Sequence, residues 1–127
     1  MIYIISDKYP ENLIKLLNMT NVQQYNERML TPGVDWKEVL RQKMNECQFF
    51  LYVLNANTYN NSSCQFQLDY TKMTGKKILC YYDRACLYEA VIEAIGNQAK
   101  LLNEKPGNSD EVLVEIVQKI KIEMNNG

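Results

Sequence analysis

The chain has 127 residues, which is enough for one domain with a hydrophobic core and too few for two domains of typical size. Its net charge of -1 provides no electrostatic footprint for nucleic acid or a membrane surface. Histidine is absent, so any chemistry must use carboxylates, hydroxyls, amides or a thiol. We expect a single domain over residues 1–127, with no metal and no resident cofactor.

The first half of the chain predicts strands and helices in alternation. Ile2–Ile5 is a continuous apolar run, as expected of a buried strand. Pro10 suits a first helical turn, and apolar residues at helical spacing follow it. Residues 22–30 can hold a weaker strand. Asp35 is placed to cap a second helix, in which Trp36 begins an apolar face.

The second half of the chain repeats this alternation. Its strands are predicted over Phe49–Leu54 and Ile78–Tyr82, and its helices from Ser62 or Ser63 to about Gly75, over 87–95, and from about 109 to the end. Strands that alternate with helices imply parallel pairing with right-handed crossovers. The sequence therefore predicts a three-layer α/β fold, in which a flavodoxin-like parallel sheet is flanked by helices.

Cysteine usage and apolar run length indicate where the protein resides. The four cysteines form no C-x-x-C pair and lie within apolar patterns, which is typical of reduced, buried thiols. The chain starts directly with an apolar strand and lacks the basic start and long apolar stretch of a secretion signal. The longest apolar run, Phe49–Leu54, is much too short to span a bilayer. These features predict a cytoplasmic protein.

Polar residues follow three of the predicted strands. Ser6 and Asp7 come after the first, an asparagine-rich loop over 55–61 after the second, and Asp83 after the third. Ligands of open parallel sheets bind outside the carboxyl ends of the strands. We therefore expect these loops to form the candidate site.

The helix that follows Ser63 carries a glutamine in a distinctive position. At about 100° per residue, one apolar stripe contains Phe66, Tyr70 and Met73, and another contains Cys64, Leu68 and Thr71. Gln67 projects between the stripes, whereas Asp69 points to the opposite side. A polar side chain held there, beside helix N-terminal amides, is typical of a site residue that faces a cleft. A solvent-exposed or capped glutamine is the alternative.

The segment Cys64-Gln65-Phe66-Gln67-Leu68-Asp69 resembles the C-x-[FY]-E-L-D signature of TIR domains, with one change. The match continues through Tyr70 and Thr71. Gln67 stands where the enzymes of this family have a catalytic glutamate. Across most of its length the chain looks most similar to small bacterial TIR-like proteins of antiphage systems such as Thoeris.

The resemblance implies that NAD is a substrate, cleaved at the bond between nicotinamide and ribose. The family glutamate binds the ribose hydroxyls and stabilises an oxocarbenium-like state. The product would be ADP-ribose, a cyclic isomer or an ADP-ribosyl conjugate, acting as a second messenger on a separate effector protein. Assembly into a homo-oligomer is also implied, because TIR domains commonly act as assemblies.

A glutamine at position 67 keeps the shape of a glutamate and loses its charge. Loss of one electrostatic stabiliser typically costs a factor of about 100 to 1000 in rate. The resemblance therefore implies that this chain is nearly or wholly inactive. Either a natural pseudoenzyme or a form altered to trap its substrate would carry Gln67.

The resemblance also implies substrate-binding roles for six further residues: Ser6, Asp7, Trp36, Asn57, Tyr59 and Cys64. The first two would bond ribose or phosphate, the tryptophan would stack on a base or the nicotinamide, and the loop pair would close over a nucleotide. Helix capping, core packing and turn formation are their respective structural alternatives. For the cysteine we expect packing, because no basic neighbour would lower its thiol pKa.

Two other functions fit the same residues. One is a non-catalytic TIR adaptor that acts by domain association. The other is a nucleoside deoxyribosyltransferase-like N-glycosidase, because that α/β group also has a glutamate on the helix after the central strand.

Overall fold

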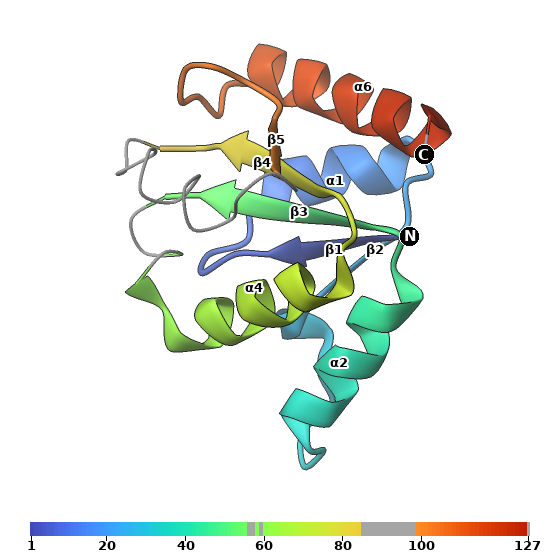
Figure 1. Cartoon of the computed structure of the whole chain (residues 1–127). Helices are drawn as coiled ribbons and strands as arrows, with labels where there is room; N and C mark the ends of the chain where they lie inside the picture. Colours follow the sequence, from blue (N-terminus) through green and yellow to red (C-terminus); the bar gives the residue numbers. More distant parts are fainter. Residues whose placement is uncertain (56–57, 59, 85–98, 127) are drawn as a thin grey trace.

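Five parallel strands form one sheet in a computed structural model that describes residues 1–55, 58, 60–84 and 99–126. The strands are β1 (Ile2–Ile5), β2 (Gln24–Asn26), β3 (Phe49–Leu54), β4 (Ile78–Tyr82) and β5 (Ala99–Leu101). Their order across the sheet is β2-β1-β3-β4-β5 (Figure 1). This order and the parallel pairing confirm the predicted flavodoxin-like α/β fold.

Helices cover both faces of this sheet. In the described part of the chain, α1 (Glu11–Met19) and α6 (Asp110–Asn126) pack on one face, and α2 (Trp36–Glu46) and α4 (Ser62–Thr74) pack on the other (Figure 1). A short 3-10 helix, η1 (Glu27–Met29), follows β2 directly. The arrangement is a three-layer sandwich, as predicted.

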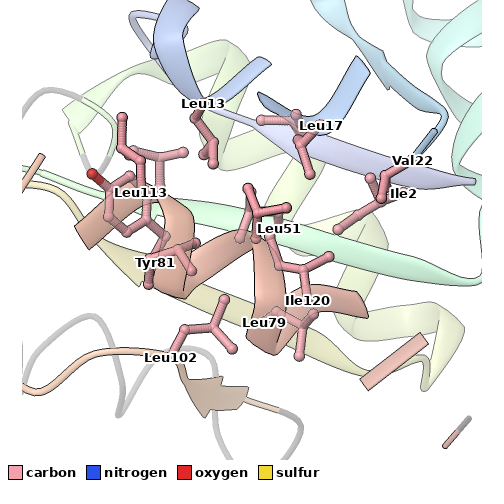
Figure 2. Close-up of a cluster of buried hydrophobic side chains, with 14 of the residues drawn as sticks. Ile2, Leu13, Leu17, Val22, Leu51, Leu79, Tyr81, Leu102, Leu113 and Ile120 are labelled. Atoms are coloured by element: carbon pink, nitrogen blue, oxygen red, sulfur yellow. The ribbon is translucent and has the colours of Figure 1, made fainter. Parts of the chain in front are cut away.

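Each central strand contributes side chains to two hydrophobic cores. In β1, Ile2 and Ile4 face α1 and α6, whereas Tyr3 and Ile5 face α2 and α4. Figure 2 shows the first core, in which residues of α1 and α6 meet the sheet from one side. Burial on both faces explains why these strands are apolar throughout.

The helix ends are largely determined by local polar residues. Asp35 caps α2 as predicted, because its Oδ1 accepts from the Glu38 amide at 3.4 Å. The cap of α4 is Asn61 rather than either serine: its Oδ1 accepts from the Cys64 amide at 3.0 Å. Gly75 ends α4 with φ of 70°, a left-handed conformation that glycine adopts freely.

Of three further predictions, one differs from the structure, one is confirmed over a shorter range, and one lies outside the described residues. Pro10 precedes α1 as its N-cap residue instead of occupying its first turn. Strand β5 was not predicted, and the weaker strand expected within 22–30 is only the three residues of β2. The helix expected over 87–95 lies outside the described residues.

Candidate functional site at the carboxyl edge of the sheet

A groove of about 460 Å³ lies at the carboxyl ends of the strands. It is lined by Asp7, Lys8, Tyr9, Pro10, Glu11, Asn12, Asn55, Asp83, Arg84, Asn108 and Leu113. These residues come from the loops after β1, β3 and β4 and from the starts of α1 and α6. Between β1 and β3 the strand order reverses, so the groove lies at the topological switch point, where open α/β sheets bind ligands.

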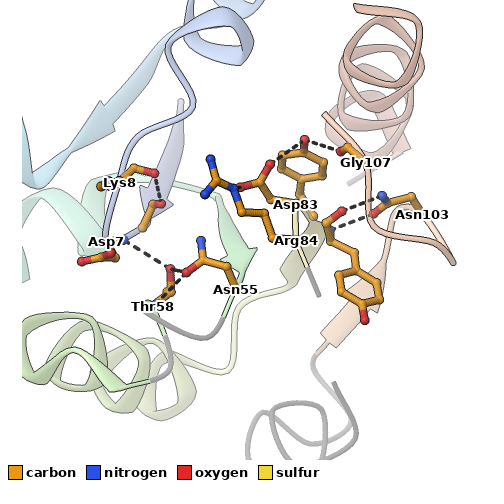
Figure 3. A network of polar contacts seen from close by, with 11 residues as sticks. Asp7, Lys8, Asn55, Thr58, Asp83, Arg84, Asn103 and Gly107 are labelled. Atoms are coloured by element: carbon orange, nitrogen blue, oxygen red, sulfur yellow. Dashed lines mark hydrogen bonds and ion pairs between the residues drawn. The ribbon is translucent and has the colours of Figure 1, made fainter. Parts of the chain in front are cut away.

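Hydrogen bonds hold one wall of the groove in place. The backbone amide of Asp7 donates to Thr58 Oγ1 at 3.3 Å, and the Thr58 hydroxyl donates to Asn55 Oδ1 at 3.1 Å (Figure 3). Asn61 Nδ2 also donates to Asp7 Oδ1 at 3.3 Å. The loop after β1 is therefore tied to the loop after β3 and to the start of α4.

Ser6 and Asp7 do not cap a helix, which was the structural alternative for both. The side chain of Ser6 is buried, and its Oγ donates to the carbonyl of Lys8 at 2.6 Å. Asp7 is half-buried and lines the groove. Of this pair, Asp7 is the residue that a bound molecule can reach.

The opposite wall includes Asp83 and Arg84, the first two residues after β4. Arg84 and Asp83 form an ion pair of 3.7 Å, and the Arg84 side chain is 69% exposed. Its guanidinium extends toward the loop of Asp7 and Lys8 (Figure 3). For Arg84, near a strand end, the sequence favours a solvated surface role over a phosphate contact. Its position in the groove makes it a candidate ligand for phosphate.

Gln67 is completely buried beneath this edge of the sheet. The Tyr3 hydroxyl donates to Gln67 Oε1 at 2.7 Å. Gln67 Nε2 lies within hydrogen-bonding distance of Glu27 Oε2 at 3.1 Å and of the carbonyl and Oγ of Ser63, each at 3.2 Å. Gln67 therefore lies between α4 and β1 and does not face an open cleft, in contrast to the expectation from helical spacing.

Glu27 lies directly beside Gln67, and the sequence patterns did not single it out. It follows β2 directly, is half-buried, and accepts from Ser63 Oγ at 2.7 Å as well as from Gln67. Its backbone amide donates to the hydroxyl of Tyr9, which lines the groove, at 3.1 Å. Its position in the sequence could have indicated this location, because a carboxylate at the end of a weak parallel strand must lie at the carboxyl edge of the sheet.

Trp36 lies away from the groove at the start of α2. It is 38% exposed and packs edge-on against Phe66 of α4, with ring centroids 5.5 Å apart. The residue is therefore neither core nor part of the groove. Met73, further along the same stripe of α4, is 81% exposed, so this stripe does not pack over its full length as expected.

Cys64 is a packing residue in this structure. It is buried in the core between α4 and the sheet, and burial raises the pKa of its thiol to about 12. A thiol with so high a pKa is a poor nucleophile at neutral pH. Asp69 is exposed, whereas Asn57 and Tyr59 lie outside the described residues.

Residues 1–55, 58, 60–84 and 99–126 contain neither a cluster of metal ligands nor a helix that could cross a membrane. Within these ranges, no three or more cysteine, aspartate or glutamate side chains gather as metal ligands would. Within the same ranges, no helix combines the length and the apolar character that crossing a membrane requires.

Comparison with known proteins places this fold in a class. No protein-family model matches the sequence, and no curated protein does. Among solved structures, the chain is similar to the TIR domain of the Toll-related receptor TRR-2 from Hydra magnipapillata, with a TM-score of 0.68 and 13% sequence identity. The match covers 99% of this chain and 98% of that one. The chain therefore has the fold of a TIR domain over nearly its whole length.

Proposed function

We propose that this protein binds NAD or a related ADP-ribosyl nucleotide in the groove and cleaves the bond between nicotinamide and ribose. The observation that supports the proposal is the groove itself, which lies at the switch point of a TIR fold with polar groups on both walls. Arg84 and Lys8 suit the two phosphates of such a nucleotide, whereas Asp7 and Asn55 can bond ribose hydroxyls.

The proposed reaction is a hydrolysis. The bond between ribose C1′ and the nicotinamide nitrogen breaks, and its electron pair leaves with nicotinamide, which becomes neutral. Water attacks C1′ and loses a proton, so the products are ADP-ribose, nicotinamide and one proton. Positive charge develops on the ribose as the bond breaks, and a nearby carboxylate stabilises it. Attack by another acceptor in place of water gives a cyclic isomer or a conjugate.

The resemblance to bacterial antiphage proteins extends this proposal to a role in defence. The nucleotide product would act as a second messenger on a separate effector protein. Formation of a homo-oligomer would raise activity if a neighbouring copy completes the groove. An amide at position 67 lowers the rate by a factor of about 100 to 1000 unless another carboxylate supplies the charge.

Binding can be tested apart from catalysis by titrating the protein with ADP-ribose in a calorimeter. Arg84→Gln should weaken binding about tenfold, because it removes one charged hydrogen bond to phosphate. Arg41→Gln is the matched control, because Arg41 lies on α2 away from the groove. Equal affinities for the two variants would contradict phosphate binding by Arg84. Tighter binding of a plain nucleoside than of ADP-ribose would instead favour the N-glycosidase alternative.

One observation favours the adaptor as a second candidate. Trp36 and Phe66 form a partly exposed aromatic pair, and the ammonium group of Lys37 lies 5.5 Å from the Trp36 ring and 5.4 Å from the Phe66 ring. Aromatic side chains are enriched in protein interfaces. Trp36→Ala should then abolish self-association or partner binding in sedimentation experiments, while Arg84→Gln leaves it unchanged. The reverse pattern would count against the adaptor.

A further inference from the structure

We propose that Glu27, and not the residue at position 67, is the carboxylate that contacts the substrate ribose, and that Gln67 is its positioning residue. This inference rests on the proposed function. It assigns to Glu27 the negative charge that a glutamate at position 67 would supply. It changes the expected consequence of the glutamine, because a carboxylate lies directly beside position 67.

Two hydrogen bonds from α4 fix the position of the Glu27 carboxylate. Ser63 Oγ donates to its Oε1 at 2.7 Å, and Gln67 Nε2 donates to its Oε2 at 3.1 Å. Both donors belong to the first turns of α4, whereas Glu27 begins η1 after β2. The carboxylate therefore lies at the junction between the signature helix and the carboxyl edge of the sheet.

The carboxylate keeps capacity for a ligand. An ionised carboxylate has about four lone-pair sites, and these two protein bonds use two of them. The side chain is half-buried, so it is not closed off from solvent. Its neighbour Arg28 lines a smaller hollow of about 330 Å³ together with Asp7, Lys8 and Tyr9 of the groove wall. The two hydroxyls of a ribose would fill the two remaining sites.

Tyr3 determines which way the Gln67 amide points. Burial raises the pKa of the Tyr3 phenol, so its hydroxyl remains a donor, and it bonds the carbonyl oxygen of the amide at 2.7 Å. The amide nitrogen must then point toward Glu27. A glutamate at position 67 would have no hydrogen to donate there when ionised. It would place two carboxylates about 3 Å apart, a distance at which like charges cannot both ionise readily. Glutamine is therefore the residue that suits Glu27.

The first experiment measures nicotinamide release from NAD and the affinity for ADP-ribose. Glu27→Gln should lower the rate by a factor of about 100 to 1000 and also weaken binding. Asp69→Asn is the matched control, because Asp69 is an exposed carboxylate on α4. It should leave the rate and the affinity unchanged.

The second experiment exchanges the two side chains and needs no ligand. Gln67→Glu should lose thermal stability relative to wild type as the pH rises above about 4.3, the usual pKa of a glutamate, because the second carboxylate must ionise beside the first. Adding Glu27→Gln to Gln67→Glu should restore the stability, because an amide again faces a carboxylate. A Gln67→Glu protein that is as stable as wild type from pH 4 to pH 8 would overturn the pairing.

The outcomes separate this inference from the proposed function. If wild type releases nicotinamide and Glu27→Gln does so equally fast, the inference is wrong and the function stands. The same holds if Gln67→Glu is active while wild type is not, because the carboxylate then belongs at position 67. If wild type and every variant neither bind ADP-ribose nor release nicotinamide, the proposed function is overturned and the inference with it.

Discussion

The hydroxyl of Tyr3 and the amide of Gln67 form a hydrogen bond of 2.7 Å inside the protein, between residues 64 positions apart in the chain. This bond joins β1 to α4 across the second core. It leaves the Gln67 nitrogen free to bond Glu27 and Ser63, so it organises the whole polar cluster beneath the carboxyl edge.

Removal of the Tyr3 hydroxyl should therefore destabilise the fold. Tyr3→Phe leaves the Gln67 carbonyl oxygen buried without its donor, which should cost about 1 to 3 kcal/mol in the free energy of unfolding. Urea denaturation measures this. Tyr70→Phe is the control, because its hydroxyl bonds Asn45 in a solvent-exposed position at 3.0 Å and should cost less. Equal decreases in the free energy of unfolding for the two variants would mean that the buried hydrogen bond contributes no more than the exposed one.

Asn61 should connect helix stability to the shape of the groove. Its Oδ1 caps α4 and its Nδ2 donates to Asp7. Asn61→Ala should lower the free energy of unfolding by about 0.5 to 2 kcal/mol, as for other N-cap residues, and should weaken ADP-ribose binding. Asn61→Ser keeps a cap acceptor and loses the amide donor to Asp7, so it should affect binding while largely preserving stability in urea. Loss of stability without any change in binding would contradict this connection.

Glu123 should make the fold sensitive to acid. Its side chain is 8% exposed and pairs with Lys100 and, at 2.8 Å, with Lys77. Hydrogen bonds from Lys100 and Lys77 lower the pKa of this carboxyl. A lowered pKa gives stability that is present above 4.5, the ordinary value, and is lost as the pH falls. Glu123→Gln should flatten this part of the stability curve in urea denaturation, whereas Glu115→Gln on the exposed side of α6 should not.

Buried thiols should make the fold less stable at alkaline pH. Burial raises the pKa of Cys64 and of Cys80 to about 12, from an ordinary value of 9.0. The folded state therefore keeps thiol protons that the unfolded chain releases, and stability should fall as the pH rises above 9. Cys80→Val fills a similar volume without a titratable group and should show a shallower decline by circular dichroism. An unchanged slope would show that this thiol is not responsible.

Strand prediction worked best where burial is greatest. β1, β3 and β4 occupy the residues expected of them, because each is buried on both faces and reads as an unbroken apolar run. β5 was missed because Ala99–Leu101 is three residues long and only partly buried, so it carries little periodic pattern. Short edge strands depend on their neighbour for structure, and β5 pairs with β4 from Ile78 to Cys80.

The site was harder to predict than the fold, for a related reason. Gln67 was found through a local motif, but its burial depends on Tyr3, which is remote in sequence. Glu27 reaches α4 only because β2 pairs with β1, with Asn26 opposite Ile4. Neither contact follows from spacing along one helix or strand. A contact between remote elements needs the strand order and register, which the sequence patterns did not provide.

The strand order has a consequence for how the molecule folds. β1 pairs with β3 in a register that sets Ile2 opposite Phe49, so the centre of the sheet closes a long loop before it can gain stability. Folding should therefore be slow for a chain of this size. The cluster of Tyr3, Glu27 and Gln67 draws on three elements that meet only after this closure. Binding competence should consequently appear late in refolding, together with the last gain of structure.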